Sequence, residues 1–220
     1  MKKSHCYGII GLGRFGMPLA KKLAQEGKEI IGIDQDEERV KELREYSEYA
    51  YVCKKMTKEV LEEVGISNCD IVIVCIGSKI ETSILTTLNS MNLGVPQVIA
   101  KATTEEQGEV LEKLGAQVVY PERDMALKIA EKILRKNLVD YIAIGKDVEI
   151  IEIHATSGMI GKSIVEMRVR EKYGLNIVAI HNLKDTKTDI DPHYQMTSED
   201  TMVVIGKRKN VSDFIDDYSA

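Results

Sequence analysis

Residues 7–34, YGIIGLGRFGMPLAKKLAQEGKEIIGID, carry the strongest structural pattern in this sequence. It contains an apolar run, a GLGRFG loop, a segment with helical periodicity and a second apolar run that ends at Asp34. A glycine loop between a strand and a helix, with an acidic residue closing the next strand, is typical of a nucleotide-binding βαβ unit. This stretch leaves open whether the chain chemically converts that nucleotide or only senses it.

Each glycine of the loop has its own physical role. Gly11 permits the tight turn, Gly13 lets a phosphate approach the backbone, and Gly16 lets the helix and strand pack closely. The phosphates would meet the positive N-terminus of a helix that starts near Phe15, which is a further candidate contact.

Two charged side chains bear on which nucleotide is bound. Asp34 would accept hydrogen bonds from ribose hydroxyls and repel a 2′-phosphate, which favours NAD-like or ATP/ADP-like ligands over NADP; the alternative is an exposed strand-end or capping acid. The guanidinium of Arg14 can reach a terminal phosphate, of its own or a neighbouring subunit's ligand. Its alternative role is that of a solvated surface arginine.

From residue 7 to about residue 120, short apolar runs alternate with helix-patterned segments that start near Phe15, Asp36, Thr57, Lys79 and Thr104. Apolar, β-branched strands separated by helix-length connections predict a parallel sheet covered on both faces. This is the α/β, doubly wound, Rossmann-like fold. The expected strands are YGIIG (7–11), EIIGID (29–34), AYVC (50–53), DIVIVCIG (70–77), QVIAKA (97–102) and AQVVYP (116–121).

A helix over 122–137 carries more apolar surface than one contact face requires. Its apolar residues cover an arc of roughly 200°, about twice the usual stripe. We therefore predict a homodimer with this helix in the interface; the monomeric alternative places its second side on the C-terminal domain. The residues concerned are Met125, Ala126, Leu127, Ile129, Ala130, Ile133 and Leu134.

After about Leu138 the pattern becomes α+β. A half-exposed strand is predicted over 148–156, a helix over 161–174 closed by Gly174, two strands over 175–181 and 201–206, and a short helix over 209–219. The predicted domains are therefore 1–137, which binds the nucleotide, and 138–220, whose small size suits a regulatory or dimerising domain.

Composition places the chain among soluble globular proteins. Its 30 basic residues are spread among 35 acidic ones and form no basic cluster, which argues against nucleic acid as a partner. No apolar run approaches the roughly 18 residues of a membrane span, and MKKSHCYGIIGLG contains no apolar signal segment. The four cysteines form no CxxC pair, so reduced and mostly buried thiols are expected.

Groups suited to enzyme chemistry are scarce. A dehydrogenase needs an acid or base near the nicotinamide. His5 precedes the first strand and the other three histidines belong to the small C-terminal domain, so surface or structural roles are expected for all four. Gly77, in the loop after the fourth strand, could border the nucleotide but supplies no base.

Several segments together resemble a known family. IIGLGRFG, IGSKIETSILTTL, VIAKA, LEKLGAQVVYPERDMALKIA and GKSIVEMRVREKYGLNIVAI are similar to the gating subunits of Ktr-type potassium transporters. These are RCK-domain proteins, with a Rossmann-like TrkA-N half followed by a small TrkA-C (RCK-C) half. The resemblance covers nearly the whole chain, and the single-copy length is like that of the Ktr gating protein rather than the longer Trk type.

The resemblance implies regulation without turnover. Such subunits form an octameric ring, a tetramer of dimers, on the cytoplasmic face of a membrane potassium-translocating partner, and ATP and ADP compete for the cleft. It implies phosphate contacts from Gly11, Gly13, Gly16 and Lys101, ribose binding by Asp34, a γ-phosphate contact from Arg14, and a divalent cation such as Mg²⁺ held by Glu122. The alternatives are a solvated lysine at Lys101 and a first-turn acid that offsets the helix dipole at Glu122.

The resemblance also implies a second ligand. The C-terminal half of several relatives binds cyclic di-AMP at a dimer interface, and Arg170 and Asn176 have the matching spacing around KYG. Candidate apolar walls for adenine are Ile164, Val169, Ile177 and Pro192; the first three are equally good core residues.

One segment departs from the family. Cys53-Lys54-Lys55-Met56-Thr57 stands where relatives often have small residues beside the adenine, which bears on nucleotide preference. Two competing hypotheses follow from the residues: a small NAD-dependent oxidoreductase, and an NAD(H)-sensing module of another transporter.

Overall fold

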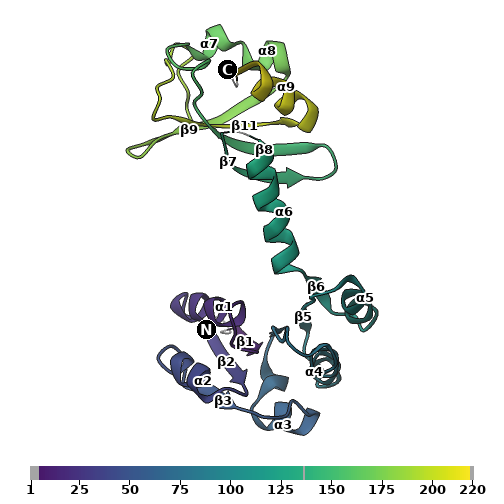
Figure 1. Ribbon diagram of the computed structural model, residues 1–220. Coiled ribbons are helices and arrows are strands. Elements are labelled where there is room, and N and C mark those ends of the chain that lie inside the picture. Colours follow the sequence, from purple (N-terminus) through teal and green to yellow (C-terminus); the bar gives the residue numbers. More distant parts are fainter. Residues whose placement is uncertain (1–4, 136, 219–220) are drawn as a thin grey trace. The chain divides into compact units, whose positions relative to one another are not determined.

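The computed structural model describes residues 5–135 and 137–218 (Figure 1). Packing divides the chain into two compact units, residues 1–125 and 126–220. Lys136, within the predicted helix 122–137, and Ser219, at the end of the predicted helix 209–219, lie outside the described residues, as do 1–4 and Ala220.

The first unit is a parallel six-stranded sheet in the order β3-β2-β1-β4-β5-β6. This confirms the predicted fold class. Its strands are β1 (Cys6–Ile10), β2 (Glu29–Asp34), β3 (Tyr49–Val52), β4 (Ile71–Val74), β5 (Gln97–Lys101) and β6 (Gln117–Val119). Its helices are α1 (Gly16–Gln25), α2 (Glu37–Leu43), α3 (Lys58–Glu63), the 3-10 turn η1 (Ile66–Asn68), α4 (Ile80–Asn92) and α5 (Glu105–Lys113).

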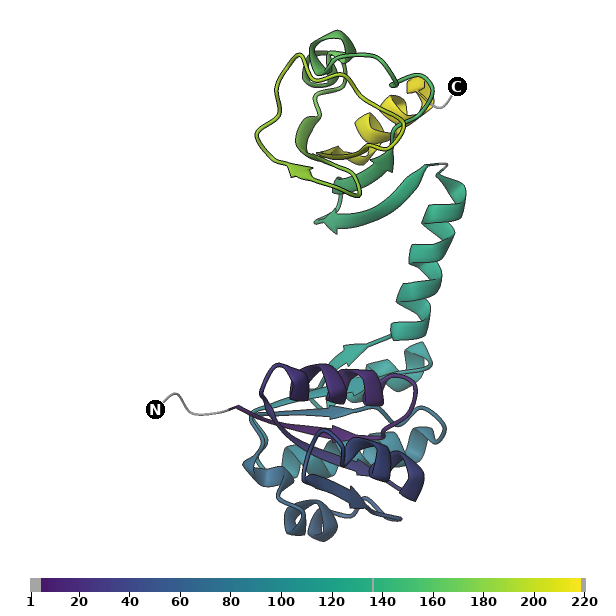
Figure 2. The ribbon, with the colours of Figure 1, turned by 90° about the vertical axis from the view of Figure 1, so that its left-hand side faces the viewer.

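Successive residues of each strand face opposite sides of this sheet, and both sides are covered (Figure 2). Ile9 packs in the core beneath α1 and α2, whereas Ile10 packs in the core on the side of α3, α4 and α5. Two buried faces explain why these strands read as continuous apolar runs.

The predicted helix starts are confirmed as capping positions. Asp36, Thr57 and Thr104 each accept a hydrogen bond from a backbone N–H in the first turn of α2, α3 and α5. Phe15 and Lys79 occupy the same position before α1 and α4.

The second unit is an antiparallel five-stranded sheet in the order β10-β9-β11-β8-β7, with helices packed on it. The helix α6 (Pro121–Leu134) spans the division between the units. The remaining elements are β7 (Leu138–Ile144), β8 (Val148–His154), α7 (Ile164–Met167), α8 (Val169–Tyr173), β9 (Asn176–His181), β10 (Thr186–Lys187), β11 (Thr201–Lys207) and α9 (Arg208–Tyr218).

Three details of the second unit differ from the sequence-based expectation. The single helix predicted over 161–174 is two helices, because Arg168 adopts φ 47°, a left-handed conformation that ends α7 before α8 begins. β7 was not predicted; its sequence LVDYIAI, in which Asp140 is the one charged residue, follows α6 closely and pairs with β8. The two-residue strand β10 was too short to show a pattern.

All four cysteines are buried free thiols, as expected. Among the described helices, none is both long and apolar enough to cross a membrane.

Candidate functional site

The glycine loop lies where the strand order reverses. β1 and β4 are neighbours in the sheet, and the helices that follow them, α1 and α4, pack against opposite faces. In doubly wound sheets, ligands bind at this switch point, beyond the carboxyl ends of the strands.

The loop geometry requires two of its glycines and leaves the third open. Gly11 has φ +100° and donates its N–H to the Ile33 carbonyl oxygen at 2.7 Å. A Cβ on Gly16 would lie 2.0 Å from the Gly11 carbonyl oxygen, so only glycine fits. A Cβ on Gly13 would have as its nearest neighbour Arg39 Nη1, at 3.8 Å, which leaves room for a ligand to approach the backbone.

The two helices at the switch point differ from the other helices of the sheet. Neither α1 nor α4 receives a capping hydrogen bond from a side chain, and the first turn of α1 contains no acidic residue. By contrast, α2, α3 and α5 are each capped and carry acidic residues in the first turn. The positive N-terminus of α1 therefore remains available to an anion such as phosphate.

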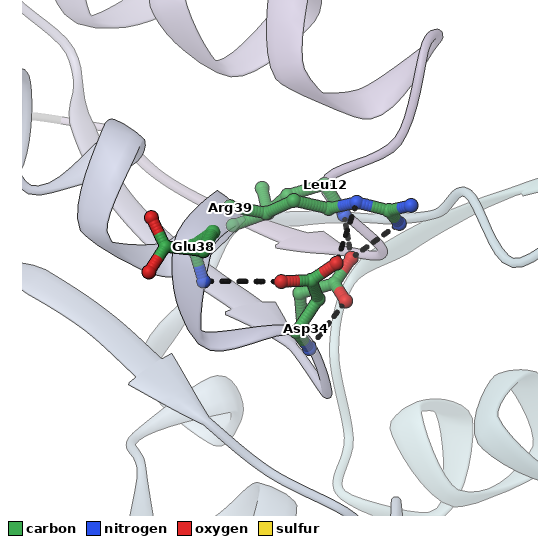
Figure 3. Close-up of polar contacts among 5 residues, drawn as sticks. Leu12, Asp34, Glu38 and Arg39 are labelled. Atoms are coloured by element: carbon green, nitrogen blue, oxygen red, sulfur yellow. Dashed lines mark hydrogen bonds and ion pairs between the residues drawn. The ribbon is translucent and has the colours of Figure 1, made fainter.

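Asp34 is held against the glycine loop (Figure 3). It is 4% exposed, and its Oδ2 accepts the Leu12 N–H at 2.6 Å, while its Oδ1 accepts the Asp36 N–H at 2.9 Å. The carboxylate thus fixes the loop to the end of β2.

Arg39 is a site residue that sequence reasoning missed. From α2 its Nη1 lies 3.5 Å from Asp34 Oδ2, and its Nε lies 3.4 Å from Asp36 Oδ2 (Figure 3). This cation offsets the negative charge of Asp34 and borders Gly13. The signal in the sequence was its place three residues after the capping Asp36 of IDQDEER, which puts it on the first turn of α2.

A second group of predicted residues converges on Lys101, at the end of β5. Its side chain is 10% exposed, and its Nζ forms an ion pair with Glu122 and lies 6.0 Å from the ring centre of Phe15. A Cβ on Gly77 would lie 3.5 Å from the same Nζ. The structure therefore brings Phe15, Gly77, Lys101 and Glu122 together.

Neighbouring positive charges lower the pKa of Glu122. Its pKa is lowered, chiefly by the hydrogen bond from Lys101, with a smaller contribution from the charge of Arg14, which is itself exposed. The Glu122 side chain is 67% exposed. Burial raises the pKa of nearby Cys75 to about 12, so this thiol stays protonated at the floor of the loop.

A divalent cation at Glu122 would need ligands beyond those that the described residues gather. Across residues 5–135 and 137–218, no three His, Cys, Asp or Glu side chains are placed to hold a metal. One exposed carboxylate with nucleotide phosphates suits Mg²⁺, which binds through few protein ligands.

The segment that departs from the family is anchored at both ends. Cys53 donates its N–H to the Asp34 carbonyl oxygen at 2.9 Å, and the Met56 carbonyl oxygen accepts from Asn89 Nδ2 at 2.9 Å. Lys54 and Lys55 between them are exposed.

The residues predicted for a second ligand lie in the second unit, around α7, α8 and β9. Pro192 approaches α7, since its carbonyl oxygen accepts the Val165 N–H at 3.0 Å. Arg170 and Asn176 are exposed on either side of Gly174, which turns the chain with φ +64°. Ile164 and Ile177 are half-buried against the core, whereas Val169 is 3% exposed and belongs to it.

Comparison with known proteins covers both units. Residues 7–121 match the TrkA-N domain family and residues 148–217 match the TrkA-C domain family. The chain is 39% identical over 215 residues to the Ktr system potassium uptake protein C of Bacillus subtilis, covering 97% of this chain and 96% of that protein. It is 35% identical to the Ktr system potassium uptake protein A of the same organism, covering 96% of each chain.

A solved structure with the same fold is the GsuK channel bound to NAD. The TM-score is 0.65 at 20% identity, over 97% of this chain and 39% of that one. The near full-length likeness to the Ktr proteins places the chain with regulatory proteins and not with enzymes. It belongs to the family of TrkA-N plus TrkA-C proteins that includes the Ktr system potassium uptake proteins A and C.

Proposed function

We propose that this chain is the regulatory subunit of a membrane potassium-translocating protein, and that it works from the cytoplasmic face by binding ATP or ADP at the glycine loop. The observation that carries the proposal is the uncapped, acid-free N-terminus of α1 beside Gly13, with Asp34 fixed against the loop. We assign nucleotide binding to residues 1–137 and regulation to residues 138–220.

The proposed ligand is ATP or ADP, and NAD(H) is the alternative, favoured by the NAD-bound state named for the GsuK channel. Titration calorimetry with ATP, ADP and NADH tests this choice. Saturable binding of ATP and ADP supports the proposal. Binding of NADH alone would instead assign the chain as an NAD(H) sensor.

The assembly we propose is a homodimer through α6 that builds an octameric ring. Five large apolar side chains of α6 are each at least half exposed, which suits a helix covered by a second copy. They are Met125, Leu127, Ile129, Ile133 and Leu134. Light scattering of the purified protein should give a mass that is a multiple of the dimer; a monomer at micromolar concentration would contradict the assembly.

We propose that the ring has an active and an inactive shape, and gating requires that the nucleotide bind these two shapes unequally. Moving the equilibrium between the two shapes from 1:99 to 99:1 takes about 5.5 kcal/mol of differential affinity, which the nucleotide sites of several subunits can supply together. A ligand that bound both shapes equally would shift nothing, however tightly it bound.

Arg14→Ala is expected to lower the affinity for ATP more than the affinity for ADP. The exposed guanidinium can reach the γ-phosphate, and a hydrogen bond to a charged group contributes about 1.5–3 kcal/mol. Calorimetry should show the ATP/ADP affinity ratio falling more than about tenfold. Lys21→Ala, a lysine of α1 paired with Glu42, is the control. Equal losses for both nucleotides would remove Arg14 from this role.

Cyclic di-AMP is proposed as a second ligand, at Arg170 and Asn176. Arg170→Ala removes the cation that would pair with a phosphate, so binding of cyclic di-AMP should fall at least about tenfold while ATP binding is unchanged. Arg168→Ala is a control, because Arg168 pairs with Glu171. Unchanged cyclic di-AMP binding by the Arg170 variant would refute the assignment.

A further inference from the structure

Two thiols meet at the end of the sheet opposite the glycine loop. Cys6 begins β1, and Cys69 lies two residues before β4, the neighbouring strand. Their sulfur atoms are 3.3 Å apart, and the residues are 8% and 2% exposed. Because β1 and β4 are parallel, this pair lies at their amino ends, away from the nucleotide site at their carboxyl ends.

The backbone around the two thiols is fixed. Cys6 donates its N–H to Asp70 Oδ2 at 2.9 Å, and Asp70 donates its N–H to the Cys6 carbonyl oxygen at 2.9 Å. Gly8 leaves room for the second thiol, since a Cβ there would lie 3.3 Å from Cys69 Sγ and 2.8 Å from Ile66 Cδ1. The short sulfur–sulfur distance is thus set by the register of two central strands.

Cys6 also borders a cavity of about 360 Å³. The wall carries three carboxylates and two phenol rings, so a cation would be favoured inside it, by charge and by contact with the ring faces. These residues are Glu29, Glu63, Asp70, Tyr49 and Tyr51.

We propose that Cys6 and Cys69 form a thiol pair that a small cationic disulfide, admitted through this cavity, converts to an intramolecular disulfide. The Cys6 thiolate attacks one sulfur of the reagent, so a mixed disulfide forms and one reagent thiol leaves with a proton. Cys69, having lost its proton, then attacks Cys6 Sγ and expels the second reagent thiol. The protein gives up two electrons and two protons, and the reagent becomes two thiols.

The surroundings also explain why the pair stays reduced without such a reagent. Burial, and then the charges of Glu29 and Asp70, raise the pKa of the Cys6 thiol, and burial is likewise the main cause of the raised pKa of Cys69. A protonated thiol is a poor nucleophile. The ammonium groups of a cationic reagent would offset those carboxylates when it enters.

The test treats the folded protein with one of three disulfides: cystamine, which is cationic, hydroxyethyl disulfide, which is neutral, or glutathione disulfide, which is anionic. Free thiols are then blocked with N-ethylmaleimide, and tryptic peptides are sequenced by mass spectrometry. We expect peptide 4–14 to be linked to peptide 59–79 at Cys69 rather than at Cys75. At low ionic strength cystamine should react about tenfold faster than glutathione disulfide, and added salt should narrow that difference.

Two variants sharpen the result. Cys69→Ser should stop the reaction at a mixed disulfide on Cys6, while Cys53→Ser, which removes a thiol that is 9% exposed on another loop, should leave the Cys6–Cys69 product unchanged. Complete labelling of both thiols by N-ethylmaleimide after exhaustive cystamine treatment would mean that neither was oxidised, and would overturn the proposal. So would a link through Cys53 or Cys75, or equal rates for all three reagents.

Discussion

Gly16→Ala is expected to abolish measurable nucleotide binding and to destabilise the first unit. The new Cβ would lie 2.0 Å from the Gly11 carbonyl oxygen and 3.2 Å from Cys75 Cβ, and a backbone atom cannot turn aside as a side chain can. The loop must therefore move away from the N-terminus of α1. We expect about 1–3 kcal/mol of lost stability, typical of overpacking, and a loss of affinity above about 100-fold.

Gly13→Ala is the matched variant that separates folding from binding. Its Cβ would have no neighbour closer than Arg39 Nη1 at 3.8 Å, so thermal unfolding should be nearly unchanged. Calorimetry should nevertheless show ATP and ADP binding weakened at least about tenfold, about 1.4 kcal/mol, because the methyl occupies the path of the phosphate. Full affinity in Gly13→Ala would remove the phosphate from this loop.

Glu149→Gln is expected to destabilise the second unit by about 3 kcal/mol. Glu149 is 1% exposed; its Oε1 lies 2.6 Å from Arg135 Nη1, and its Oε2 faces Arg208 Nε at 3.4 Å, an ion pair without hydrogen-bond geometry. Removing this charge leaves Arg135, only 17% exposed, with Glu131 as its remaining carboxylate partner, and losing one member of a buried ion pair is costly.

The control for Glu149 is Glu131→Gln, which removes the other partner of Arg135. Glu131 is one helical turn away, 3.1 Å from Arg135 Nε and 28% exposed, so its loss should cost only about 0.5 kcal/mol. Urea titration followed by hydrogen exchange of the β11 peptide reports on the second unit alone. Equal effects of the two variants would contradict the role of the buried carboxylate.

Local patterns were sufficient to predict much of the first unit. The apolar runs, the capping residues Asp36, Thr57 and Thr104, and the glycine loop all act within a few residues of where they stand. Their consequences could therefore be read before any fold was known. In the second unit, Arg168 divides a predicted helix in two because it adopts a left-handed conformation. Such a conformation leaves no trace in hydrophobic periodicity, so the break could not be predicted.

Contacts between distant residues could not be predicted in the same way. By resemblance, Lys101 was assigned to a phosphate and Glu122 to a divalent cation, but only the fold places their side chains against one another. Cys6 and Cys69 are 63 residues apart, and the pairing of β1 with β4 brings their sulfurs together. Spacing along the chain carries no information on such pairs; Arg39, close to Asp34 in sequence, could have been found.

Binding of ATP or ADP is expected to change the assembly of subunits without consuming the nucleotide. Native mass spectrometry with each nucleotide checks both points at once, because it reports subunit number and ligand mass together. We predict an oligomer built from dimers, with one intact ATP or ADP per chain, and with different ring stabilities in the two states. A monomer that converts ATP to products, or an oligomer that retains neither nucleotide, would show that the chain does not work in this way.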